Sequence, residues 1–362
     1  MKIAILGTRG IPNHYGGFEQ FAQYISYQLV ENNHEVFVYN SHNHPYKNNE
    51  WKGVKIIHCY DPEYKIGTFG QFIYDFNCII DSRKREFDVI LQLGYASSSI
   101  WQWLFHKDVI IISNMDGIEW KRSKYSSIVR RFLLFAERIV VKSSHFLIAD
   151  SIGIKDYYRR KYGVDAKYIP YGSDIRTDLD ESILDNLKLE KNNYNILIAR
   201  MVPENNIEII LESYENSSTE KKLILVGDYN NSYGKYIRSR FTDSRIIYTG
   251  YISSIEKLDA LRKYSNIYFH GHSVGGTNPS LLEAMSSNCF IFAHENEFNR
   301  SILGEDALYF CCKRCIIPVL NSNDNHEKRD IFISNNLKKI KNKYLWKYIV
   351  SDYEKYIVSS KI

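Results

Sequence analysis

The segment that most constrains the fold of this chain runs from His270 to Met285 and reads HGHSVGGTNPSLLEAM. It follows the short apolar run 266–269, which is typical of a buried parallel strand. A glycine pair and an Asn-Pro dipeptide predict a loop, and Pro279 suits the first turn of a helix, where its missing N–H is not needed. The order strand, glycine-rich loop, helix is the repeating unit of a doubly wound sheet, so we expect an α/β protein.

A phosphate group suits the geometry that this segment predicts. The N-terminus of a helix presents free backbone N–H groups and the positive end of the helix dipole. We expect the N–H groups of Ser280 and Leu281 to face the phosphate, and Glu283 to accept hydrogen bonds from a neighbouring ribose. An ordinary strand–helix turn with a solvated Glu283 would have the same pattern, because glycine-rich loops are common in α/β proteins.

The same alternation of strand and helix begins at the N-terminus. The apolar run 2–7 predicts a buried strand, and the segment 18–30 has apolar residues at helical spacing. Between them lies a loop with Gly16 and Gly17, whose lack of a side chain lets the backbone approach a ligand closely. The next strand is expected over 34–39. This order is the start of a doubly wound parallel sheet.

A break in the alternation divides the chain into two halves. The stretch 178–193 is polar and charged, which predicts a linker, and the alternation restarts with a strand over 195–200. A chain of 362 residues is long enough for two domains. We expect Rossmann-like domains at 1–172 and 194–340, and a C-terminal helix in 341–362 that crosses back to the first domain.

The composition argues against a disordered or membrane-spanning chain. Hydrophobic residues make up 44% and charged residues 25%, as in an ordinary globular protein. No apolar run approaches the roughly 20 residues needed to span a bilayer, and the first strand starts at once, so we expect no signal peptide. Among six cysteines, the CxxC at Cys312–Cys315 lacks the second pair of a tetrahedral zinc site and the context of a redox motif. We expect a cytoplasmic protein with reduced thiols.

Positive charge is concentrated between residues 121 and 142, where seven basic residues face a single acid, Glu137. The basic residues are Lys121, Arg122, Lys124, Arg130, Arg131, Arg138 and Lys142. Because apolar residues lie between them, the segment predicts a basic amphipathic helix suited to an anionic membrane surface. A helix packed on the core with a solvated basic face would have the same pattern. We expect no nucleic-acid partner, since no recognised binding module accompanies this charge.

Several separated motifs together resemble a known family. They are the two doubly wound halves, the glycine-rich loop after the first strand, Arg200 after the first strand of the second half, and the PSLLEAM helix at 279–285. This combination resembles the retaining glycosyltransferases of family 4, which have the GT-B fold. The motifs GTRGIP (7–12), YGGFE (15–19), NMDGIEWKR (114–122) and HSVGGTNP (272–279) resemble its bacterial rhamnosyltransferase-like branch.

The resemblance implies two Rossmann-like domains that face a central cleft, with the nucleotide sugar on the second and the acceptor on the first. It implies that the enzyme moves a sugar, L-rhamnose from dTDP-rhamnose, with retention, to a lipid-linked precursor of a cell-surface polysaccharide at the inner membrane face. It also implies that no metal or other cofactor is needed. Two alternatives stay open: a GT-B nucleotide-sugar epimerase, and a non-catalytic partner subunit.

The resemblance also implies where the donor binds. The expected donor-binding residues are Gly16, Gly17, Arg200, Asn205, Gly276, Thr277, Asn278, Ser280, Leu281 and Glu283. Arg200 and Glu283 are also expected to be catalytic, because an arginine can bind the leaving diphosphate with two parallel hydrogen bonds. Two positions depart from the family pattern: Asn205 or Asn206 occupies the region where a lysine is usual, and Gly275 lies where a first glutamate is usual. Thr277 or Asn278 would then contact the sugar.

In the first half, the family often has a histidine where this chain has Asp116. We expect Asp116 to be catalytic, either as a base for the acceptor hydroxyl or by stabilising positive charge on the sugar. Asn114 and Glu119 would lie beside it on the acceptor side. A simple Asp-Gly turn at Asp116 would have the same sequence.

Overall fold

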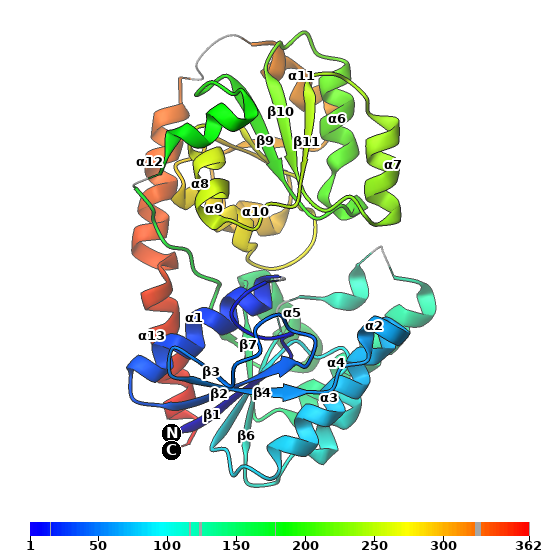
Figure 1. Ribbon diagram of the computed structural model, residues 1–362, viewed down its shortest axis with the longest axis vertical. Helices are drawn as coiled ribbons and strands as arrows, with labels where there is room; N and C mark the ends of the chain where they lie inside the picture. Colours follow the sequence, from blue (N-terminus) through cyan, green and yellow to red (C-terminus); the bar gives the residue numbers. More distant parts are fainter. Residues whose placement is uncertain (15, 116, 123–124, 178, 323–326, 362) are drawn as a thin grey trace. The chain divides into compact units, whose positions relative to one another are not determined.

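The computed structural model describes the whole chain except residues 15, 116, 123–124, 178, 323–326 and 362. The chain forms two compact units, Met1–Tyr171 with Trp346–Ile362, and Gly172–Leu345 (Figure 1). Each unit contains one sheet of mainly parallel strands with helices between successive strands. The predicted α/β class with two doubly wound sheets is therefore confirmed.

The first unit is built on an eight-stranded sheet in the order β3-β4-β2-β1-β5-β6-β7-β8. Its strands are β1 (Lys2–Leu6), β2 (Glu35–Ser41), β3 (Glu50–Trp51), β4 (Val54–Cys59), β5 (Val89–Leu93), β6 (Ile110–Asn114), β7 (Phe146–Ala149) and β8 (Lys167–Tyr168). All neighbours are parallel except the pair β3 and β4. The central strands are buried along almost their whole length, which explains their continuous apolar sequences.

Helices connect these strands in the first unit. They are α1 (Gly17–Glu31), α2 (Glu63–Ile66), α3 (Phe69–Ser82), α4 (Ser127–Ser143), α5 (Ile152–Tyr162) and α13 (Trp346–Ser359), with the short 3-10 turns η1 (Ser99–Leu104) and η2 (Glu119–Lys121). The C-terminal helix α13 packs on α1, with the ring of Trp346 stacked on that of Tyr24 at 4.5 Å between centroids. Both ends of the chain therefore lie in the same unit.

The basic segment forms α4, but this helix begins later than the sequence predicts. Ser126 caps it by accepting a hydrogen bond from the Val129 N–H, so Lys121 and Arg122 lie outside the helix. Its one acid, Glu137, is fully buried and accepts hydrogen bonds from Tyr157 at 2.7 Å and Tyr162 at 2.6 Å. One face of α4 is thus packed in the core, as the alternative interpretation expected.

The second unit contains a six-stranded parallel sheet in the order β11-β10-β9-β12-β13-β14. Its strands are β9 (Tyr194–Ile198), β10 (Lys222–Val226), β11 (Ile246–Gly250), β12 (Tyr268–His270), β13 (Ile291–His294) and β14 (Leu308–Phe310). After β9 the chain adds β10 and β11 on one side and then β12 to β14 on the other. The strand order therefore reverses beside β9, which is where open α/β sheets bind ligands at the carboxyl ends of their strands.

The helices of the second unit are α6 (Ile207–Glu215), α7 (Ser232–Arg240), α8 (Ile255–Lys263), α9 (Pro279–Ser286), α10 (Glu297–Leu303), α11 (Lys313–Asn321) and α12 (Arg329–Lys339). Shorter turns are η3 (Glu181–Leu187), η4 (Pro203–Asn205) and the π-helical η5 (Ile340–Tyr344). The linker expected over 178–193 was partly wrong, because η3 contacts α8 and buries Leu184. Of the helices that the structure describes, none has both the length and the apolar character to cross a bilayer.

One buried acid makes the stability of the first unit depend on pH. Asp75 on α3 is 7% exposed and accepts a hydrogen bond from the Ser97 hydroxyl at 2.5 Å. Burial raises the pKa of Asp75 to about 7 from an ordinary 3.8, and the charge of Asp61 adds to the effect, while the Ser97 bond opposes it. Between the ordinary pKa of 3.8 and the raised value of about 7, the folded protein therefore holds a proton on Asp75 that the unfolded chain has lost.

We predict that Asp75→Asn stabilises the protein at pH 8. Because the folded-state pKa is raised, the stabilising contribution of the protonated acid is present at acidic pH and is lost as the pH rises towards 7. Asparagine is neutral and has nearly the same shape as protonated aspartic acid. The free energy of unfolding of the variant should therefore exceed that of the wild type by about 2–4 kcal/mol at pH 8 and by little at pH 4. Urea unfolding at both pH values tests this. Asp156→Asn, at an exposed position, is the control and should leave the free energy of unfolding unchanged at both pH values. Equal gains in both variants would contradict a raised pKa of Asp75 as the cause.

Candidate functional site

Two loops meet at the carboxyl edge of the second sheet, beside the point where the strand order reverses. One follows β9 and covers 199–206, and the other follows the neighbouring strand β12 and covers 271–278. The carbonyl oxygen of Glu204 in the first loop accepts hydrogen bonds from the Ser273 N–H at 3.0 Å and the Ser273 hydroxyl at 2.8 Å in the second. The two loops are therefore held as one surface.

A close backbone approach strengthens this connection. The side-chain amide of Asn206 donates to the Gly271 carbonyl oxygen at 2.7 Å. A Cβ atom on Gly271 would lie 2.0 Å from the carbonyl oxygen of Asn205, so residues with a side chain cannot fit without moving the loop. The glycine after β12 thus serves the packing of the two loops.

Arg200 lies on the first loop, as predicted, and is exposed. Its backbone oxygen accepts hydrogen bonds from the Val202 N–H at 2.9 Å and from the Asn205 side chain at 2.7 Å. Within the part of the chain that the structure describes, no carboxylate pairs with its guanidinium. An exposed guanidinium on a fixed backbone can take an anion from solvent.

Asn205 differs from what the sequence predicts. It is 3% exposed, and its amide nitrogen donates to the carbonyl oxygen of Arg200. Because a buried amide that is already bonded is poorly placed to contact a donor, this corrects the expected direct contact. Asn205 instead holds the backbone that carries Arg200.

The start of α9 also needs a correction. Asn278 caps the helix, and its side-chain oxygen accepts hydrogen bonds from both the N–H and the hydroxyl of Ser280 at 3.0 Å. The Leu281 N–H donates to the backbone oxygen of Asn278, also at 3.0 Å. The N–H groups of Ser280 and Leu281 are therefore not free for phosphate as expected, because asparagine is a strong N-cap that satisfies them. The helix dipole still favours an anion at this end.

Gly275, in the glycine pair before α9, has a backbone conformation that suits glycine. Gly275 has a φ of +126°, which side chains rarely allow, although no described atom lies within 4 Å of a Cβ built there. The obstacle to a side chain is therefore the backbone and not lack of space. Gly276 is half-buried, and Thr277 is 3% exposed, so both form part of the loop's inner surface.

Glu283 on α9 is held by a buried arginine that sequence reasoning missed. Nη2 of Arg262 lies 2.5 Å from Oε2 of Glu283, and Nη1 of Arg262 lies 2.9 Å from Oδ1 of Asp259. The Arg262 side chain is 2% exposed and that of Glu283 is 21% exposed. Glu283 is thus neither simply solvated nor fully buried, and Arg262 sets its orientation. The only signal in the sequence was the i, i+3 charge pair Asp259 and Arg262, which does not stand out in a helix with three other charged residues.

His270 at the end of β12 is a second residue that sequence reasoning did not assign. It is 1% exposed, and its ring stacks on that of His272 at 4.5 Å between centroids. Burial, together with the nearby His272 and His294, lowers its pKa well below the ordinary value. His270 is therefore a neutral residue beneath the second loop at neutral pH.

In the first unit, the loop after β1 is held to α1. Glu19 is buried and accepts hydrogen bonds from the Arg9 N–H at 2.9 Å and the Thr8 hydroxyl at 3.2 Å. Gly16 caps α1 in an extended conformation and Gly17 opens the helix, with Gly17 exposed. Both glycines thus lie at a helix N-terminus, where their role towards a donor stays a prediction.

Of the residues expected on the acceptor side, Asn114 and Glu119 lie in the described part of the chain. Asn114 is 1% exposed and its amide donates to the Tyr353 hydroxyl at 2.9 Å, so it ties β6 to α13. This corrects the expectation that Asn114 meets an acceptor: its position at the end of a buried strand places it in the core. Glu119 forms an ion pair with Arg122 at 2.7 Å. Asp116 lies outside the described residues.

The sequence matches two family models, one for each half. Residues 1–174 match "Domain of unknown function (DUF1972)", and residues 180–344 match "Glycosyl transferases group 1". A curated relative, an uncharacterised glycosyltransferase of Methanocaldococcus jannaschii, is 23% identical over 390 residues, which span 98% of this chain and 97% of the relative.

Solved structures share the fold over almost the whole chain. Sucrose-phosphate synthase from Thermosynechococcus elongatus has a TM-score of 0.80 at 15% identity, covering 99% of this chain and 98% of that one. HepE of Anabaena, in complex with UDP and glucose, has a TM-score of 0.77 at 14% identity, covering 99% of this chain and 100% of that one. At such identities the likeness concerns the fold, and it confirms the predicted GT-B class.

We predict that Arg262→Met destabilises the protein by about 3–5 kcal/mol, because it leaves the carboxylates of Asp259 and Glu283 without their buried cation. Arg240→Met on α7 is the matched control, since its ion pair with Glu215 is half exposed at 3.5 Å and should contribute about 0–1 kcal/mol. The free energy of unfolding in urea distinguishes them. Similar losses in the two variants would mean that Arg262 does not hold the site.

Proposed function

Since residues 180–344 match the glycosyl transferases group 1 model, we propose that this chain is a glycosyltransferase whose second unit binds a nucleotide-sugar donor at the surface formed by the loops after β9 and β12. The observation that carries the proposal is the exposed, unpaired guanidinium of Arg200 at the reversal of strand order, in the part of the chain described by the structure. The crystal structures of HepE with UDP and with UDP-glucose support a donor of this chemical class.

Each part of the donor has a proposed partner. Arg200 binds the diphosphate, with the positive end of the α9 dipole beside it. Glu283 accepts hydrogen bonds from the ribose hydroxyls, and Arg262 is a positioning residue that fixes the orientation of the Glu283 carboxylate. Gly276, Thr277 and Asn278 form the loop next to the sugar.

The proposed reaction breaks the bond between the anomeric carbon of the sugar and the oxygen of the diphosphate. Negative charge then builds on the leaving nucleoside diphosphate, and Arg200 stabilises it. The acceptor hydroxyl oxygen forms the new bond to the anomeric carbon and loses its proton. We propose Asp116 as the carboxylate that takes this proton or stabilises positive charge on the sugar, and retention of the anomeric configuration, both from the family resemblance.

The proposed donor is dTDP-rhamnose, supported by the motifs at 7–12, 114–122 and 272–279. The proposed acceptor is a lipid-linked precursor of a surface polysaccharide. Turnover assays with dTDP-rhamnose, UDP-glucose and a GDP-sugar separate the possibilities. Turnover of UDP-glucose alone would keep the glycosyltransferase and exclude the rhamnose assignment.

We predict that Arg200→Ala lowers kcat by about 10²–10³-fold, the usual effect of removing one preorganised group that stabilises transition-state charge. Glu283→Gln should instead weaken binding of the nucleoside diphosphate, measured by calorimetry. Arg238→Ala, which removes an exposed arginine from α7, is the control and should keep full turnover. Wild-type turnover and binding in both site variants would place the donor elsewhere.

We also propose that the first unit contacts an anionic membrane surface, where a lipid-linked acceptor would lie. Large apolar side chains are exposed on α3 and α4 and on η1, which contacts both helices. They are Phe69 (77% exposed), Trp103 (76%), Ile128 (79%) and Phe135 (56%). Arg131 and Arg138 are exposed on α4, while its one acid is buried. Apolar groups flanked by cations are what an interfacial helix uses.

We predict that the protein sediments with vesicles containing anionic lipid and is released by salt, because the attraction is screened. The double variant Arg131→Glu with Arg138→Glu should lose most of this binding. Arg159→Glu with Arg160→Glu on α5 makes the same change in net charge at exposed positions and should retain it. Equal binding to neutral vesicles, or equal loss in both double variants, would contradict a specific surface on α4.

A further inference from the structure

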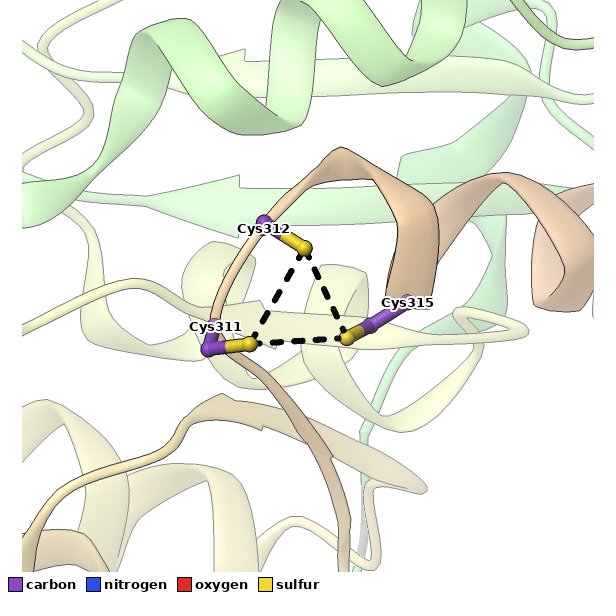
Figure 2. Close-up of side chains that lie close together, drawn as sticks. All are labelled: Cys311, Cys312 and Cys315. Carbon is purple, nitrogen blue, oxygen red and sulfur yellow. Dashed lines mark hydrogen bonds between the residues drawn. The ribbon is translucent and has the colours of Figure 1, made fainter.

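Three cysteines gather where β14 ends and α11 begins. Cys311 follows the last residue of β14, Cys312 is the N-cap of α11, and Cys315 lies in the first turn of that helix. Figure 2 shows the three sulfur atoms turned toward one another. Their separations are 3.7 Å between Cys311 and Cys315, 3.9 Å between Cys312 and Cys315, and 3.9 Å between Cys311 and Cys312.

The triangle of sulfur atoms has the dimensions of a zinc site. A Zn–S bond of about 2.3 Å in tetrahedral geometry requires sulfur atoms about 3.8 Å apart. The three observed separations, 3.7, 3.9 and 3.9 Å, lie close to this edge length. We propose that Cys311, Cys312 and Cys315 bind one Zn²⁺ ion as thiolates, with water in the fourth position. Each thiol that binds releases its proton to the solvent.

The distribution of cysteines supports a binding role. The other three, Cys59, Cys78 and Cys289, are buried singly in the cores, whereas all the accessible cysteines of the chain belong to this cluster. Cys311 is exposed and the other two are half-buried, so an ion can enter. Among the described residues, no fourth histidine, cysteine or carboxylate completes the group. An open fourth position is therefore expected.

The local backbone favours thiolates. Cys312 and Cys315 lie at the N-terminus of α11, where the helix dipole stabilises negative charge. Lys313 and Arg314, which lie between them in sequence, add positive charge. The sequence pattern alone discounted Cys312–Cys315 because a second CxxC is missing. The third ligand is instead Cys311, whose sulfur atom lies beside those of Cys312 and Cys315 because of the turn between β14 and α11.

A disulfide is the competing use of these thiols. Three mutually equidistant sulfur atoms suit a metal ion better than a pair, because a disulfide leaves one thiol over and needs sulfur atoms about 2.05 Å apart. The ion would join the end of the edge strand β14 to α11. It would therefore raise the stability of the second unit when bound.

Cobalt titration of the full-length protein tests the proposal. The protein is kept reduced with a phosphine, stripped with a chelator and titrated with Co²⁺, which reports thiolate ligation through its charge-transfer absorption. We expect one Co²⁺ per chain with a tetrahedral spectrum, displaced by one equivalent of Zn²⁺. Replacing Cys311, Cys312 and Cys315 together by serine should abolish the signal, and each single replacement should weaken Zn²⁺ binding at least about tenfold, as expected when a ligand is lost.

A thermal melt gives a second readout that does not depend on cobalt. Added Zn²⁺ should raise the Tm of the wild type and leave that of the triple variant unchanged. Cys59→Ala removes a buried cysteine from the other unit and should keep both the cobalt signal and the Zn²⁺-dependent rise in Tm. Reduced wild-type protein that binds neither ion, or a triple variant that binds as well as wild type, would overturn the zinc site. In the first case, a disulfide formed on mild oxidation would assign the cluster to redox chemistry.

Discussion

The reversal of strand order beside β9 is the constraint on which the candidate site depends. Parallel strands end at the same edge of a sheet, and a chain that adds strands first on one side of β9 and then on the other brings the loop after β9 next to the loop after β12. Residues separated by about 70 positions, such as Glu204 and Ser273, then share hydrogen bonds. This arrangement determines the positions of Arg200 and of the start of α9, because each belongs to one of the two loops.

The charged side chains are the groups of the site that can contact a ligand, because the neighbouring amide side chains already form hydrogen bonds within the protein. Asn205 and Asn278 use their amides to hold the backbone and cap a helix, so they define the positions of other groups. Arg262 is buried between Asp259 and Glu283, where a cation is tolerated only because both carboxylates pair with it. Glu283 thus has a paired cation although its side chain is only partly exposed. The exposed Arg200 is left as the group that can respond to a ligand.

Much of the fold could be predicted because periodicity reports burial directly. The runs around β1, β5 and β9 are apolar since both faces of a parallel sheet are covered. The predicted bounds of the elements were less accurate where a single side chain decides the local structure. Ser126 sets the start of α4, and Leu184 turns part of an expected linker into η3. The strand β14 has only three residues, and α11 contains Pro318, which argues against a helix when the sequence is taken alone.

The sequence by itself determined the class of the protein and the location of its main motif. Strand, glycine-rich loop and helix are local patterns, and so are Pro279 at the first turn of α9 and the isolated Arg200 after β9. Only the tertiary structure decided which polar groups are available. It buried Asn114 against Tyr353 and paired Glu283 with Arg262. Burial and hydrogen-bond partners depend on contacts between distant segments, and no local pattern records them.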